Sequence, residues 1–167
     1  MSEAKVGREF VTHEFDEAIA IQRSIVEAGD ALSTTHPMPS AKRALKASAA
    51  EDRRFLRQLE TMGKAYDATG KAEGVAAALG ELMTETLGGA GKDAPDSEVY
   101  EAHAVLLALK RKQMDGAAGM RRIATAVKDP SMRTACIAFE KAQRSSSVAL
   151  SRELAAFARK ITTASAG

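Results

Sequence analysis

Residues 106–120, LLALKRKQMDGAAGM, place apolar side chains on one side of a helix and polar side chains on the other. The apolar side chains recur every three or four residues, which is the period of an amphipathic α-helix. They are Leu106, Leu109, Ala117 and Met120. Gln113 stands in the same series, where another apolar residue would continue it. The series extends in both directions, from Val99 to Val127, so the sequence predicts one long helix with a polar residue on its inward face.

Other long segments carry the same kind of series, and polar residues interrupt each of them near its midpoint. Projected at 100° per residue, the first series consists of Val11, Phe15, Ala18, Gln22, Val26, Gly29 and Leu32. The second consists of Leu45, Ser48, Asp52, Phe55, Leu59, Met62 and Tyr66, with Glu51 at its edge. The last consists of Met132, Cys136, Phe139, Gln143, Ser146, Leu150, Leu154, Phe157 and Ile161. The alternation typical of a β-strand is absent, so the sequence predicts an all-α fold.

Stretches rich in Pro and Gly divide these segments. STTHPMPS (33–40) ends the first helix, and Pro39 suits the first turn of the second. The second helix is expected to stop near Thr69 and Gly70, and a shorter amphipathic helix is expected over about 72–87. GGAGKDAPDS (88–97) and KDPS (128–131) then delimit long helices at about 97–127 and 131–161.

Long helices of similar length with short connections favour an antiparallel four-helix bundle. The extra short helix would lie between the second and third long helices. We therefore expect a single domain over residues 1–167, with its core at about 9–162 and a frayed tail at 163–167.

The composition fits a globular domain and argues against several other classes. Hydrophobic residues make up 45% and charged residues 28%. No apolar run approaches the roughly 20 residues that cross a membrane, and the N-terminus lacks the hydrophobic region of a secretory signal. A cytoplasmic protein without a membrane partner is expected. The net charge of +2 gives no reason to expect nucleic acid, and the single cysteine, Cys136, is expected in the core.

The polar interruptions are expected to meet at one level of the bundle. Helices of similar length that lie side by side bring their midpoints together, so these side chains would form one buried polar layer. Its members would be Gln22, Glu51 or Asp52, Gln113, and Gln143 with Ser146. Because burial of an unpartnered amide costs about 1–3 kcal/mol, these groups should bond to one another or to a ligand.

The order of two long helices, one short helix and two more long helices resembles the YciF-like bacterial stress-associated proteins of the ferritin-like superfamily. The phrases RRFLRQLETMGKAYDATG (53–70) and QMDGAAGMRRIATAVKDP (113–130) carry this resemblance, which covers roughly residues 12–160. It implies a ferritin-like fold, a stress-associated role and a homodimer. Such bundles hold two metal ions at mid-height through one Glu from each of two helices and a Glu-x-x-His pair from each of the others.

Carried over to this chain, the metal ligands are mostly missing. Gln22 stands where the first Glu is expected, and Arg54 stands three residues after Glu51, where a His is expected. The other two pairs read Lys110 with Gln113 and Gln143 with Ser146. Amides are weak ligands for iron or manganese, and a neighbouring cation opposes metal binding. The resemblance therefore implies a degenerate metal site, with Glu51 and Asp52 as the remaining weak candidates.

Three functions stay open at this point. A non-catalytic structural or stress-associated bundle without a cofactor is the main expectation, and an apolar face on the short helix (Val75, Leu79, Leu82 and Met83) supports a homodimer. The first alternative is a di-iron or di-manganese carboxylate protein with unconventional ligands. The second is a bundle that binds a small polar ligand in its amide layer.

The histidines suggest no catalytic centre. His13 shares a helix face with Glu9 and Glu17, which is typical of a solvated acidic surface. His36 precedes Pro37 and is expected to have a role in the turn. His103 is expected at the edge of the core.

Overall fold

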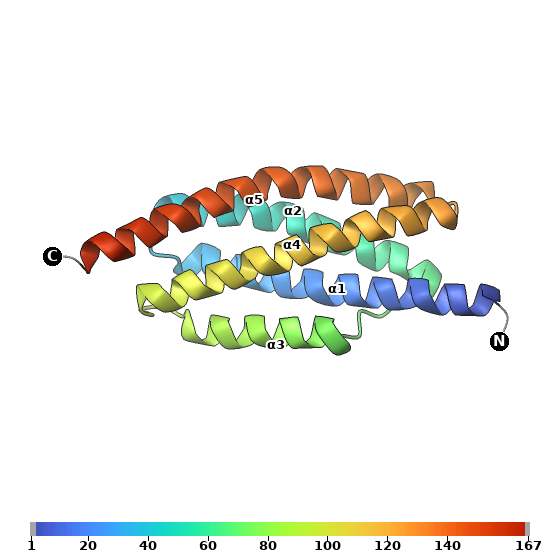
Figure 1. Cartoon of the computed structure of the whole chain (residues 1–167), viewed down its shortest axis with the longest axis horizontal. Coiled ribbons are helices and arrows are strands. Elements are labelled where there is room, and N and C mark those ends of the chain that lie inside the picture. Colours follow the sequence, from blue (N-terminus) through green and yellow to red (C-terminus); the bar gives the residue numbers. More distant parts are fainter. Residues whose placement is uncertain (1–2, 166–167) are drawn as a thin grey trace.

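The computed structural model in Figure 1 describes residues 3–165, with side chains described from residue 7 onward. Its α-helices are α1 (Glu3–Thr35), α2 (Pro39–Gly63), α3 (Gly74–Gly89), α4 (Asp96–Ala126) and α5 (Pro130–Ala164). A turn of 3-10 helix, η1 (Lys64–Tyr66), follows α2. No residue from 3 to 165 lies in a β-strand, which confirms the prediction of an all-α fold.

The four long helices form a bundle. Both α1 and α5 pack against α2 and α4, so α1 and α5 occupy diagonal corners. The short helix α3 lies along the outside of the bundle, against α1 and α4 (Figure 1). Ala76 and Met83 of α3 are buried, whereas Val75 and Leu82 remain exposed. The short helix thus packs on its own bundle with one side and leaves apolar side chains uncovered on another.

The chain between α2 and α3 differs from the sequence prediction. α2 ends at Gly63, and η1 also ends before the predicted stop near Thr69. Asp16 of α1 holds the connecting loop, because its Oδ1 accepts hydrogen bonds from the backbone N–H groups of Thr69 and Gly70, both at 2.7 Å. Gly70 has a φ of +76°, and a Cβ atom there would lie 2.4 Å from Cγ2 of Ile19. Only glycine lets the chain pass this close to α1.

Two further details differ from the sequence prediction. The inward face of α1 is centred on Ile21, Ile25 and Ala28, and Val26 is only half-buried. The last helix continues to Ala164, so it includes part of the tail that was expected to fray, while residues 166 and 167 lie outside the described residues.

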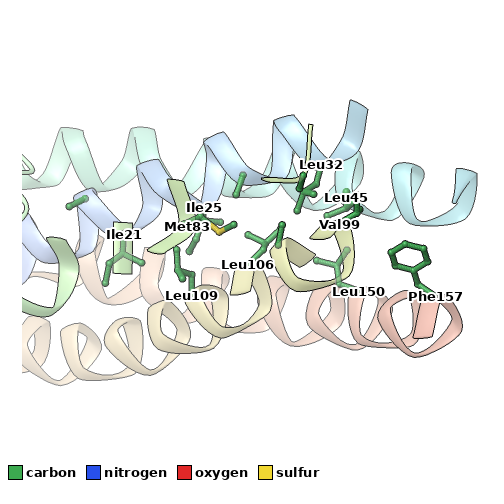
Figure 2. Packing of buried hydrophobic residues seen from close by; sticks show 14 of the residues in the cluster. Ile21, Ile25, Leu32, Leu45, Met83, Val99, Leu106, Leu109, Leu150 and Phe157 are labelled. Carbon is green, nitrogen blue, oxygen red and sulfur yellow. The ribbon is translucent and has the colours of Figure 1, made fainter. Parts of the chain in front are cut away.

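The apolar core consists of two clusters, one toward each end of the bundle. Figure 2 shows the first, in which Leu32, Leu45 and Phe157 lie toward one end. The second surrounds Phe55 and Phe139, whose stacked rings have centroids 3.7 Å apart. Buried polar side chains lie where the two clusters meet. These are Gln22, Ser48, Asp52, Lys110, Gln113 and Gln143. We call this level, around Asp52, the waist of the bundle.

None of the helices within residues 3–165 combines the length and the apolar character that a membrane crossing requires.

Candidate functional site

Asp52 is the centre of the waist, because each of the other long helices sends a polar side chain to it. Its carboxylate oxygen Oδ2 accepts from Nζ of Lys110 on α4 at 2.7 Å, and Oδ1 accepts from Nε2 of Gln143 on α5 at 2.8 Å. Its backbone carbonyl oxygen accepts from Nε2 of Gln22 on α1 at 2.9 Å. One residue of α2 therefore connects all four long helices.

Ser48 forms hydrogen bonds with both members of the ion pair. It lies one turn before Asp52 on α2 and donates to the same Oδ2 atom at 3.2 Å. Its hydroxyl oxygen also accepts from Nζ of Lys110 at 2.8 Å. The ammonium thus has two oxygen acceptors on one helix, which is the kind of environment that a buried charge requires.

The ion pair is secluded from solvent. The side chains of Lys110 and Asp52 are only 1% and 3% exposed. Burial lowers the pKa of Lys110 from its usual range, and the Asp52 carboxylate opposes that effect by attraction and by hydrogen bonding. Removing one partner of such a pair strongly destabilises the fold, because the remaining charge stays buried without compensation.

Gln113, the polar residue that interrupts the apolar series of α4, bonds to the backbone of α1. Its Nε2 donates to the backbone carbonyl oxygen of Ala18 on α1 at 2.8 Å. Ala18 lies one turn before Gln22, so Gln113 binds α1 next to the Asp52 network. The buried amide therefore joins α4 to α1.

The structure brings together only some of the residues that the sequence placed in one layer. Gln22, Asp52 and Gln143 share contacts, and Gln113 lies beside them. Glu51 and Ser146 lie outside the layer, which corrects the prediction for both.

Glu51 points away from the layer because it lies 100° around the helix from Asp52. Its side chain is 43% exposed and pairs with Arg54. Ser146 donates to the backbone oxygen of Gln143 on its own helix at 3.3 Å. The polar contacts of both side chains thus stay on their own helices.

Lys110 is the residue whose role the sequence analysis missed. In the sequence Lys110 stands as a cation that would oppose metal binding, yet in the structure it is the buried partner of Asp52. A signal was available, because Lys110 follows Leu106 by four residues and precedes Gln113 by three, which is the spacing of the inward face.

The waist does not fit a di-metal centre. Such a centre needs several carboxylate or imidazole ligands, and Asp52 is the one carboxylate in this network. Its two oxygens already accept from Lys110, Ser48 and Gln143. The Lys110 ammonium supplies the positive charge at the centre and has no lone pair to offer a metal. Two fully buried amide oxygens, Oε1 of Gln22 and of Gln143, lack a hydrogen-bond partner within the described residues, but two amide oxygens are a poor replacement for the missing carboxylates.

A second polar cluster lies near the end of the bundle where α1 turns into α2. His36 and His103 are both fully buried, and Nε2 of His36 lies 3.3 Å from Nδ1 of His103. His36 has the expected role in the turn, because its Nδ1 accepts from the backbone N–H of Met38 at 3.1 Å. The expected edge position of His103 is wrong, because this ring is fully buried. Their burial follows from helix spacing, since His36 continues the α1 face four residues after Leu32.

A third cluster is on the surface. His13, Glu14 and Glu17 on α1 have ligand-type atoms within 4.8 Å of one another. Glu17 also binds the ammonium of Lys112 on α4 at 2.6 Å. This lysine satisfies one carboxylate of the cluster, in keeping with a solvated, salt-bridged face.

Cys136 lies in the core, as expected. Burial raises the pKa of its thiol to about 12, so the reactive thiolate is not formed at neutral pH.

Comparisons with models of protein families, with curated proteins and with solved structures found no match to this chain.

Proposed function

We propose that this chain is a ferritin-like bundle of the YciF-like type, with a non-catalytic structural or stress-associated role, in which an internal ion pair takes the place of the di-metal centre. The observation that supports this proposal most is the position of Lys110. Its ammonium nitrogen lies at the waist, 2.7 Å from Oδ2 of Asp52. A protein cation thus occupies the level where such bundles would hold metal ions.

The network also suits a structural role. A buried polar contact is satisfied in one alignment of the helices and lost in others, which is how a buried Asn sets the register of a coiled coil. Here a slip of α4 by one turn would move Lys110 about 5 Å away from Asp52. The network therefore favours a single alignment of the four helices.

The same contacts argue against acid–base or nucleophilic catalysis at the waist. A catalytic carboxylate needs access to substrate and a free oxygen. Both carboxylate oxygens of Asp52 accept hydrogen bonds from other side chains, and its side chain is almost fully buried.

A metal-retention experiment tests the proposal. The chain is incubated with iron, manganese and zinc, desalted, and measured by elemental mass spectrometry. We expect no retention that depends on Asp52, because the ammonium of Lys110 already neutralises its carboxylate. Near-stoichiometric metal that is lost in Asp52→Asn would overturn the proposal and favour a metalloprotein.

The surface cluster supplies the control for this experiment. Weak retention that disappears in a His13→Asn/Glu17→Gln variant but persists in Asp52→Asn would come from the exposed side of α1, where His13, Glu14 and Glu17 gather. That result would leave the proposal for the waist intact.

Self-association through α3 is the second part of the proposal. Val75 and Leu82 are 61% and 43% exposed, and a second copy of the chain could cover them. We expect light scattering to give a dimer at micromolar concentration, and Leu82→Glu to give a monomer. Val148→Glu on α5 is the control, because Val148 is 52% exposed but lies on another helix. A monomeric wild-type chain would contradict this part.

A further inference from the structure

The hydrogen bonds around His36 define which of its nitrogens carries the proton. The backbone N–H of Met38 donates to Nδ1 of His36 at 3.1 Å. Nδ1 must therefore be an acceptor, so the neutral ring has its proton on Nε2. This assignment also excludes His36 Nε2 as a metal ligand, because a protonated nitrogen has no lone pair to donate.

The proton on His36 in turn defines the state of His103. Nε2 of His36 lies 3.3 Å from Nδ1 of His103 and donates to it. The proton of neutral His103 is then on Nε2, an atom that is buried and has no hydrogen-bond partner by geometry within the described residues. The backbone of Leu150 on α5 is nevertheless close enough to favour protonation of this ring. A chain of hydrogen bonds thus runs from the backbone of Met38, through His36 in the turn, to His103 on α4.

Apolar and aromatic groups enclose this pair. The ring of Phe157 on α5 lies 4.7 Å from that of His36, centroid to centroid. Both histidines are 0% exposed. A charge on either ring would therefore lie in a poorly solvated place.

We propose that His36 and His103 form a proton-operated latch, which holds the α1–α2 turn against α4 and α5 at neutral pH and releases it in mild acid. The latch goes beyond the structural role proposed for the waist and does not depend on it. Its elements are the contacts of His36 with Met38, His103 and Phe157.

Protonation of either ring breaks a hydrogen bond of the latch, because the added proton would face an N–H donor. A proton added to Nδ1 of His36 would face the N–H of Met38, donor against donor. A proton added to Nδ1 of His103 would likewise face the N–H of His36. Either event removes one hydrogen bond and buries a positive charge.

The charged groups around the pair do not offset this burial. A charge on His103 opposes the charged form of His36 most strongly, and Asp96 on α4 favours it. Lys160 on α5 and Lys42 on α2 also oppose it. Glu153 on α5 favours the charged form of His103. Burial outweighs these effects and lowers the pKa of both rings from 6.5 to about 4.

The sign of the pH effect follows from these pKa values. The closed latch binds fewer protons than the open one, in which the rings return to their ordinary pKa of 6.5. The closed state is therefore fully favoured above pH 6.5 and loses its advantage as the pH falls from 6.5 toward 4. Between pH 7 and pH 5, linkage increases the open fraction on the order of 20-fold for each ring that titrates.

Amide hydrogen exchange of the full chain, measured by NMR between pH 7 and pH 5 and corrected for intrinsic rates, tests the latch. The reporters are the amides of His36 and Met38, which donate to Leu32 O and to His36 Nδ1. We expect their protection to fall about 20-fold or more, while amides near Gln113 at the waist keep theirs. The latch is wrong if both regions lose protection together, or if neither does.

A variant without titratable rings supplies the comparison. In His36→Asn/His103→Leu, the Asn side-chain oxygen can still accept from the N–H of Met38, and we expect protection at the turn to stay constant with pH. The same fall in protection as in the wild type would overturn the proposal. His13→Asn is the matched control, because His13 is exposed and should leave the fall unchanged.

Imidazole ¹⁵N shifts of the wild-type chain test the latch even if the double variant fails to fold. At pH 7 they should show the proton of both buried rings on Nε2, with titration only well below pH 6.5. Ordinary titration near pH 6.5, or a proton on Nδ1 of His36, would contradict the latch.

Discussion

Replacing Lys110 with methionine is expected to lower the free energy of unfolding by about 3–5 kcal/mol. Methionine keeps much of the length of the side chain, so the main loss is the charge. The carboxylate of Asp52 would stay buried with Gln143 and Ser48 as its remaining side-chain donors. Urea unfolding followed by circular dichroism measures the change.

Adding Asp52→Asn to Lys110→Met distinguishes the effect of the unpaired charge from the effect of altered packing. Asp52→Asn removes the uncompensated charge, its Oδ1 can still accept from Gln143, and its new amide can donate to Ser48. Lys110→Met/Asp52→Asn should therefore regain much of the stability that Lys110→Met loses.

Lys112 provides the control in the same helix. It also forms an ion pair, with Glu17, but its side chain is 41% exposed. Lys112→Met should cost about 1 kcal/mol or less. Equal losses for Lys110→Met and Lys112→Met would contradict a special role for the buried pair.

Replacing Phe157 with alanine is expected to lower the free energy of unfolding by about 3–5 kcal/mol, because core packing is lost. Phe157 is fully buried and lies against His36 and, at 6.4 Å between ring centroids, Tyr100. Its removal leaves a cavity at the end of the bundle shown in Figure 2. Urea unfolding again gives the magnitude.

The histidines give Phe157→Ala a second readout. Water that enters the cavity would solvate a charge on His36, so the pKa of this ring should rise from about 4 toward 6.5. Phe10→Ala is the control, because Phe10 is 54% exposed and should change neither stability nor titration appreciably. An unchanged His36 pKa in Phe157→Ala would show that the ring does not exclude solvent from the pair.

The periodic apolar series predicted the helices well, because each series reflects a local property of one chain segment. The face that contains Leu106, Leu109 and Met120 is buried as expected. The predicted helix ends were less accurate where a residue that is distant in the sequence determines the end. α2 stops early beside a loop held by Asp16 of α1, a contact that no local pattern contains.

The residues of the polar centre were predicted only in part, and their contacts were not predicted. Helical spacing alone left Glu51 and Asp52 as alternatives, since adjacent residues lie 100° apart and either could border a broad inward face. The choice depends on what lies opposite, and Lys110 reaches Asp52 from the diagonal helix α4. A lysine in an apolar series suggests a solvated side chain until its partner is known.

The histidine pair shows the same limit. Each ring has a position compatible with burial in its own segment, yet 67 residues separate His36 from His103 along the chain. Only the packing of α4 against the α1–α2 turn reveals that one ring supplies the proton that the other accepts.

The most direct test of the central claim is to observe the ammonium group of Lys110 by ¹H–¹⁵N NMR at pH 7, with Lys110→Met to assign the signal. We expect a slowly exchanging, protonated Nζ, because that atom is buried and donates to Asp52 and Ser48. A neutral amine, or exchange as fast as that of the half-exposed Lys112, would contradict an internal cation at the waist.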